Sequence, residues 1–133
     1  MIDYEVKIFN SVYEVASPLC APKRFVSTPI DSYTKLPAGS LWEIDNATVR
    51  RRQSSTPVEN FARIAYQAEA VAATKTQCRS IYKAIDDRMI ALNFSKISGQ
   101  YITYPDNPNL VRYVARYEAE IDPDGNIYRI SAW

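Results

Sequence analysis

The most regular stretch of this 133-residue chain is LVRYVARYEAEI, residues 110–121. Apolar and polar side chains alternate along it, which is typical of a β-strand with one buried face. One face carries only apolar side chains: Val111, Tyr113, Ala115, Tyr117, Ala119 and Ile121. The other face carries most of the charge: Arg112, Arg116, Glu118 and Glu120. We therefore expect a long strand that packs on the core with one face and meets water with the other.

The segments beside this strand predict more of a sheet. Downstream, Asp122-Pro123-Asp124-Gly125 is typical of a turn, and residues 126–130 should return as a hairpin partner. The two carboxylates of the turn could suggest a Ca²⁺ loop, but no further carboxylate follows at the spacing of an EF-hand. Upstream, residues 94–104 predict a strand interrupted at Gly99.

A helix is predicted over residues 74–92. Its apolar side chains recur at helical spacing: Cys78, Ile81, Tyr82, Ile85, Met89 and Leu92. Thr74 suits the N-cap, and Asn93 can close the C-terminus. Asp86 and Asp87 project about 100° apart and so do not converge as an acid–base dyad. Lys83 can pair with Asp87, so we expect these acids on a solvated face.

Residues 60–72 fit either a strand or a helix. Their alanine content favours a helix, whereas strict alternation and the break after residue 72 favour a strand, which is our prediction. Antiparallel pairing with the strand described first would place Arg63 opposite Glu118 and Glu69 opposite Arg112. Such opposite charges would help to fix the register of the two strands.

The first third of the chain predicts a helix and shorter strands. An amphipathic helix spans residues 2–17 and should end before the proline that follows. A proline-rich connection over residues 18–40 includes a possible edge strand at 25–28. A short strand at 41–44, a turn at the next Asp-Asn pair and a returning arm at 48–53 complete this part.

Strands and helices do not alternate regularly along the chain. The sequence therefore predicts an α+β fold: a mostly antiparallel sheet of four to six strands packed by two main helices, residues 2–17 and 74–92. The length suits one domain, residues 1–133, with enough apolar surface for a core.

The amino-acid composition argues against enzymatic catalysis. The chain has no histidine, which removes the commonest general base and zinc ligand, and only three glycines, with no glycine-rich phosphate loop. The net charge of +1 gives no bulk attraction to nucleic acid or to an anionic membrane. We expect neither enzymatic activity nor a cofactor or metal.

Cysteine usage and hydropathy bear on the compartment. Cys20 and Cys78 lie far apart and match no metal or redox spacing, so we expect two buried free thiols, although one disulfide is conceivable. No apolar stretch approaches the length of a membrane span, and the acidic N-terminus lacks the plan of a signal peptide. We expect synthesis and folding in a reducing cytoplasm and no membrane partner.

The one concentration of charge is Arg50-Arg51-Arg52. It could contact DNA phosphates or an acidic protein partner, or it could lie on a solvated strand; both interpretations stay open. The ten tyrosines suit the core, with a self-associating surface as a further possibility. Stacking of RNA on the sheet is disfavoured because the exposed strand face carries charges.

Several stretches together resemble a known family. They are LWEIDN at 41–46, RRRQ at 50–53, the helix CRSIYKAIDDRMIALNF at 78–94, YVARYEAEI at 113–121 and IYR at 127–129. With the opening helix, this pattern resembles the tail terminator (neck) proteins of long-tailed bacteriophages and of prophages of Gram-positive bacteria.

The resemblance implies a structural virion protein of the neck, assembled in the cytoplasm of the host bacterium. Such proteins are α+β domains that form a homo-hexameric ring on the tail tube protein, end tube polymerisation and join the tail to the head connector. DNA only passes through the lumen. Arg50–Arg52 would line the lumen or an interface. The alternatives are a head-completion or minor capsid neck protein bound to the portal, or a nucleic-acid-binding protein that uses Arg50–Arg52.

Overall fold

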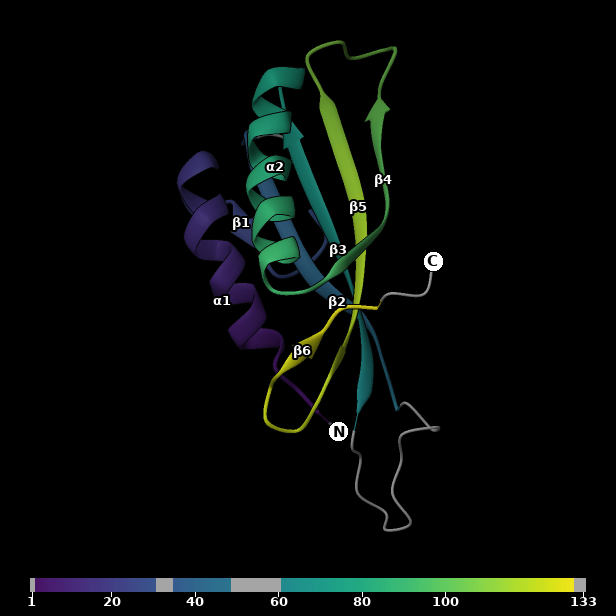
Figure 1. Cartoon of the computed structure of the whole chain (residues 1–133). Coiled ribbons are helices and arrows are strands. Elements are labelled where there is room, and N and C mark those ends of the chain that lie inside the picture. The colour runs from purple at the N-terminus through teal and green to yellow at the C-terminus, as the bar shows by residue number, and fades with distance from the viewer. Residues whose placement is uncertain (1, 31–34, 49–60, 131–133) are drawn as a thin grey trace.

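The computed structural model describes residues 2–30, 35–48 and 61–130. Two helices cover one side of a six-stranded sheet whose strand order is β1-β2-β3-β5-β4, with β6 paired to β5 (Figure 1). In chain order the elements are α1 (Glu5–Ala16), a 3₁₀ turn (Ser17–Leu19), β1 (Phe25–Val26), β2 (Ala38–Thr48), β3 (Ala62–Ala72), α2 (Lys75–Ala91), β4 (Ser95–Thr103), β5 (Val111–Ile121) and β6 (Ile127–Tyr128). The predicted α+β class is confirmed.

The centre of the sheet is the antiparallel pair β3 and β5, which stay in register from Ala62 opposite Ile121 to Ala72 opposite Val111. The ambiguous segment around residues 60–72 is thus a strand, as predicted. Its helix-facing side is buried, with Tyr66 followed by Ala68 and Ala70. Packing against two helices outweighs the helical propensity of alanine here.

The predicted register of β3 and β5 is offset by two residues, although the predicted charge pairs form. Arg63 lies opposite Glu120 on the ladder, yet its Nε donates to Glu118 Oε1 at 2.9 Å. Arg112 likewise lies opposite Val71 and donates through Nε to Glu69 Oε2 at 2.7 Å. Long side chains reach diagonal neighbours across a sheet, so charge pairing alone leaves the register ambiguous.

The predicted hairpin at residues 41–53 is wrong. β2 is one eleven-residue strand that pairs antiparallel with β3 along its whole length. The register shifts between Glu43 and Asp45, so the Asp45-Asn46 signal coincides with a bulge, which accommodates an extra residue without reversing the chain. Residues 49–53 of the expected returning arm lie outside the described residues. In β4, too, the interruption is a shift between Lys96 and Ser98 and not at Gly99.

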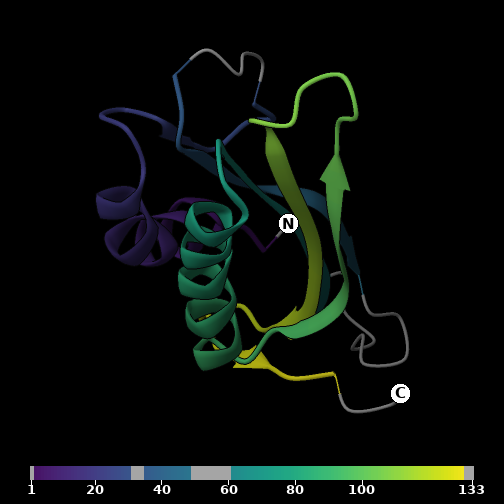
Figure 2. The same ribbon diagram turned by 90° about the horizontal axis from the view of Figure 1, so that it is seen from above.

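Both helices lie on the same side of the sheet (Figure 2). Each buries one apolar stripe: Ile8, Val12 and Ala16 in α1, and Cys78, Ile81, Ile85 and Met89 in α2. As predicted, the Thr74 side chain accepts a hydrogen bond from the Gln77 amide at 3.2 Å, and Asn93 has the left-handed φ of 73° that ends a helix. α1 begins at residue 5 and not at 2, because Ile2 is buried in the core and Asp3 Oδ1 accepts from the Glu5 amide.

Both cysteines are free thiols. Cys78 is buried and Cys20 is half-buried, so the prediction of two buried thiols holds fully for Cys78 only. Burial raises the pKa of each thiol to about 11, which keeps both protonated near neutral pH. In the described part of the chain, no helix is long and apolar enough to cross a membrane.

Candidate functional site

The predicted interface residues Arg50, Arg51 and Arg52 lie outside the described residues. Three groups of described charges bear on a possible interface: a paired set on the outer face of the sheet and two sets without ion-pair partners near its opposite edges. The location of each group follows from the strand order.

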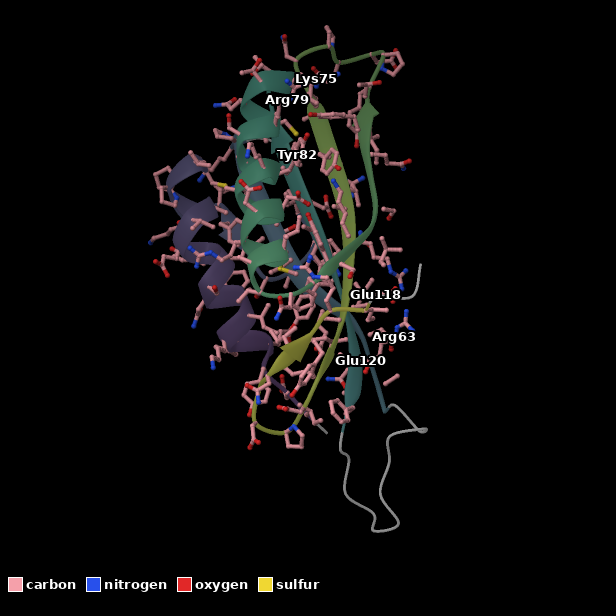
Figure 3. All side chains as sticks on the ribbon, viewed as in Figure 1. Arg63, Lys75, Arg79, Tyr82, Glu118 and Glu120 are labelled. Carbon is pink, nitrogen blue, oxygen red and sulfur yellow. The ribbon has the colours of Figure 1, made fainter. Side chains whose placement is uncertain are left out.

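On the outer face, away from the helices, the charges of β3 and β5 neutralise one another. Arg63 and Glu118 form one pair, and Glu118 also lies 3.6 Å from Arg116 Nε. Figure 3 shows Arg63, Glu118 and Glu120 gathered at the same part of the sheet. Glu69, only 2% exposed, is paired with Arg112. These pairs hold the two central strands together and leave little net charge to attract a partner.

The β4 edge is open. β4 pairs with β5 on one side, and no described strand pairs with its other side. Most of its nine residues are exposed. Its one charged residue, Lys96, reaches toward α2, with Nζ 3.7 Å from Asp86 Oδ1 and 5.2 Å from the centre of the Tyr113 ring. An exposed strand edge of this length can pair with another chain.

Three tyrosines join the β4 edge to α2. Tyr82 of α2 stacks on Tyr113 of β5, with ring centres 3.9 Å apart, and Tyr101 of β4 meets Tyr113 edge-on at 5.0 Å. Gly99 is required here, because a Cβ at that position would lie 2.1 Å from the Tyr113 hydroxyl oxygen. The tyrosine cluster therefore fixes the position of the open strand relative to the helix.

Two cations of α2 lie beside this cluster, and we call Lys75, Arg79 and Tyr101 the basic flank. Lys75 Nζ lies 4.7 Å from the centre of the Tyr101 ring, and Tyr101 is the main neighbour that raises the pKa of Arg79. Both cations are exposed and follow one another along α2 (Figure 3). Among the described residues, neither forms an ion pair with a carboxylate.

The β2 edge is covered and acidic. β1 pairs with only two of its residues, but Glu5 Oε2 accepts from the Glu43 amide at 3.0 Å, and the Asn46 side chain donates to the Ile2 carbonyl at 2.8 Å. We call Asp3, Glu5 and Glu43 the acidic edge. Burial first, and then the charges of Glu5 and Asp3, raises the pKa of Glu43 to about 7. No cation among the described residues pairs with these three carboxylates.

Asp86 and Asp122 each have a structural role. Asp86 was expected on a solvated face, but it is mostly buried and accepts from the Tyr117 hydroxyl at 2.8 Å, so that expectation is wrong. Asp87 is exposed and paired with Lys83, as predicted. Asp122 organises the last turn as expected: it accepts from the amides of Asp124 and Asn126.

A cavity of about 320 Å³ lies between α1, the end of α2 and the last hairpin. Tyr4 crosses one side of it: its hydroxyl donates to the Pro123 carbonyl at 2.6 Å, and its ring occupies the space that a Cβ at Gly125 would need. The described residues contain no group of three or more Cys, Asp or Glu side chains arranged to hold a metal.

The sequence pattern does not predict the basic flank, although it contains one signal. Lys75 is the first residue of α2, and the first turn contains no acid. A cation at the N-terminus of a helix is repelled by the positive end of the helix dipole and so does not stabilise the helix. Its presence there favours a role in binding something outside the helix. The proximity of Tyr101 could not be predicted, because it depends on how β4 packs beside α2.

No protein-family model matches the chain, and no curated protein matches it.

Proposed function

We propose that this protein is a structural virion component that forms a ring at the end of a phage tail tube, in the manner of a tail terminator. One observation carries the proposal: the sheet has two unlike edges, one open with cations beside it and one covered and acidic. Unlike surfaces on one chain form head-to-tail contacts, and such contacts close into a ring when the rotation between neighbours allows it.

The charge distribution supports a ring through which DNA passes. The net charge of +1 and the paired charges of the outer face give little general attraction to phosphate. In the proposed role the partners are further copies of the chain in a homo-hexamer, the tail tube protein below and the head connector above. The ring ends tube polymerisation and does no chemistry.

The test measures assembly and capping. The full chain is analysed by size-exclusion chromatography with light scattering, alone and with tail tubes of the same phage. We expect a species of six times the chain mass of 15.2 kDa, formed alone or on the tube, and tubes of defined length. A chain that stays monomeric beside tubes and leaves their length unchanged contradicts the proposal.

Two other results would favour the alternatives. Binding to the portal without binding to the tube would indicate a head-completion protein. Salt-dependent DNA binding that is lost when Arg50, Arg51 and Arg52 are changed to Ala would indicate a nucleic-acid-binding protein.

A further inference from the structure

We propose that the basic flank of one copy (Lys75, Arg79 and Tyr101) receives the acidic edge of the next copy (Asp3, Glu5 and Glu43). This inference rests on the proposed ring and adds the surfaces through which its subunits meet. The partner is a second copy of this chain, contacted head to tail.

The first argument is charge that is left unpaired inside the chain. Charged residues on the outer face and in α2 beyond Arg79 have ion-pair partners, such as Glu118 for Arg63 and Asp87 for Lys83. Among the described residues, Lys75 and Arg79 have no carboxylate partner, and the acidic edge has no cation. Each group therefore offers charge of the sign that the other lacks.

The second argument is position. β4 is the last strand at one edge of the sheet, and β2 lies near the other edge, with β3 and β5 between them. The two charged groups therefore cannot meet within one chain, whereas they can meet between two copies. A contact between two different surfaces leaves both ends of every assembly ready for another copy until a ring closes.

The third argument is that each group is unfavourable on its own. Lys75 faces the positive end of the α2 dipole, and the carboxylates of Glu5 and Asp3 repel that of Glu43. A neighbour of opposite charge removes both penalties at once. Apolar surface lies beside the acidic edge: Val6 of α1, the residue after Glu5, is 74% exposed.

Charge reversal tests the pairing. The variant Lys75→Glu/Arg79→Glu reverses the basic flank, and Asp3→Lys/Glu5→Lys reverses the acidic edge. Sedimentation velocity should show that each variant alone self-associates at least about 100-fold more weakly than the natural chain, because like charges then face one another. Mixing the two variants should restore assembly, since alternating copies again present opposite charges at every contact.

Two further proteins serve as controls. Lys23→Glu/Lys35→Glu makes the same change in net charge on exposed residues of the connection before β2, and it should assemble like the natural chain. Asp3→Asn/Glu5→Gln keeps the hydrogen-bond acceptors of the acidic edge without its charge, and it should weaken assembly less than reversal does. Circular dichroism checks that every variant is folded.

The outcomes separate the pairing from the ring. If the natural chain assembles and both reversed variants assemble equally well, the pairing is wrong and the ring stands. If neither variant assembles alone and their mixture does not assemble either, the two groups act at different contacts, and the proposed pairing is again wrong. If the natural chain never self-associates, with or without tubes, both proposals fall.

Discussion

The two edges of the sheet are built in opposite ways. At the β2 edge, the chain covers its own backbone with β1, with the Glu5 carboxylate on the Glu43 amide and with the Asn46 side chain on the Ile2 carbonyl. At the β4 edge, nine residues pair on one side only, and the tyrosine cluster fixes the strand beside α2. A chain that covers one edge and leaves the other open presents two different surfaces, as a head-to-tail contact requires.

Of the changes that test this difference between the edges, substitution of Gly99 at the open edge should have the largest effect on stability. Gly99→Ala places a methyl group 2.1 Å from the Tyr113 hydroxyl, and the Tyr113 ring is held between Tyr82 and Tyr101. We expect a loss of about 2 kcal/mol in the free energy of unfolding, measured by urea denaturation.

The control is the double variant Gly99→Ala/Tyr113→Phe, which removes the hydroxyl that the new methyl group meets. It should be more stable than Gly99→Ala. An equally unstable double variant would show that the clash with the hydroxyl does not cause the loss.

Gly39 is the matching position at the covered edge. A Cβ there would lie 2.9 Å from the Phe25 ring, which stacks on Phe9 with ring centres 5.4 Å apart. Phe25 belongs to a two-residue strand that can shift outward, so Gly39→Ala should cost about 1 kcal/mol in a thermal melt. A cost as large as that of Gly99→Ala would mean that β1 is as firmly held as the tyrosine cluster.

Glu43 gives the covered edge a pH dependence. Its folded pKa, about 7, is above its usual value of 4.5, so the folded state binds more protons between these values and loses stability as the pH rises through them. Glu43→Gln should therefore raise the free energy of unfolding of the dilute monomer by about 1 kcal/mol at pH 8, a figure reduced for solvent screening. At pH 4 the two proteins should unfold alike. An equal gain at both pH values would exclude the carboxylate as its cause.

The smallest effect should come from Lys83, a paired cation one turn beyond the basic flank. Its Nζ lies 2.9 Å from Asp87 Oδ2, and both side chains are well exposed. Lys83→Ala should shift the melting temperature by less than about 1 °C. It should also assemble like the natural chain, in contrast to reversal of Lys75 and Arg79. Loss of assembly would mean that the neighbour contacts more of α2 than the basic flank.

The strands and helices with a regular spacing of apolar residues could be predicted from the sequence. β5 alternates apolar and charged side chains except at Val114, and α2 has both an apolar stripe and a recognisable cap at Thr74. The full length of β2 could not be predicted, because a bulge and a turn use the same residue types, here Asp45 and Asn46, and only the pairing with β3 distinguishes them.

The candidate surfaces could be predicted less well, because they depend on distance in space. Arg63 and Glu69 were correctly paired with Glu118 and Arg112, since long side chains tolerate an error of two residues in register. The basic flank joins α2 to a strand that lies beside it only after folding, and no local pattern reports that contact. The role of Arg50–Arg52 stays a prediction.

The hydrogen bond from Tyr4 to Pro123 has a consequence for how the chain folds during synthesis. It joins residues 119 positions apart, so it cannot form until the last hairpin has left the ribosome. Until then the start of α1, which carries two carboxylates of the acidic edge, lacks this attachment. In the proposed head-to-tail contact, the acidic edge therefore reaches its full set of contacts only after the last hairpin has been made.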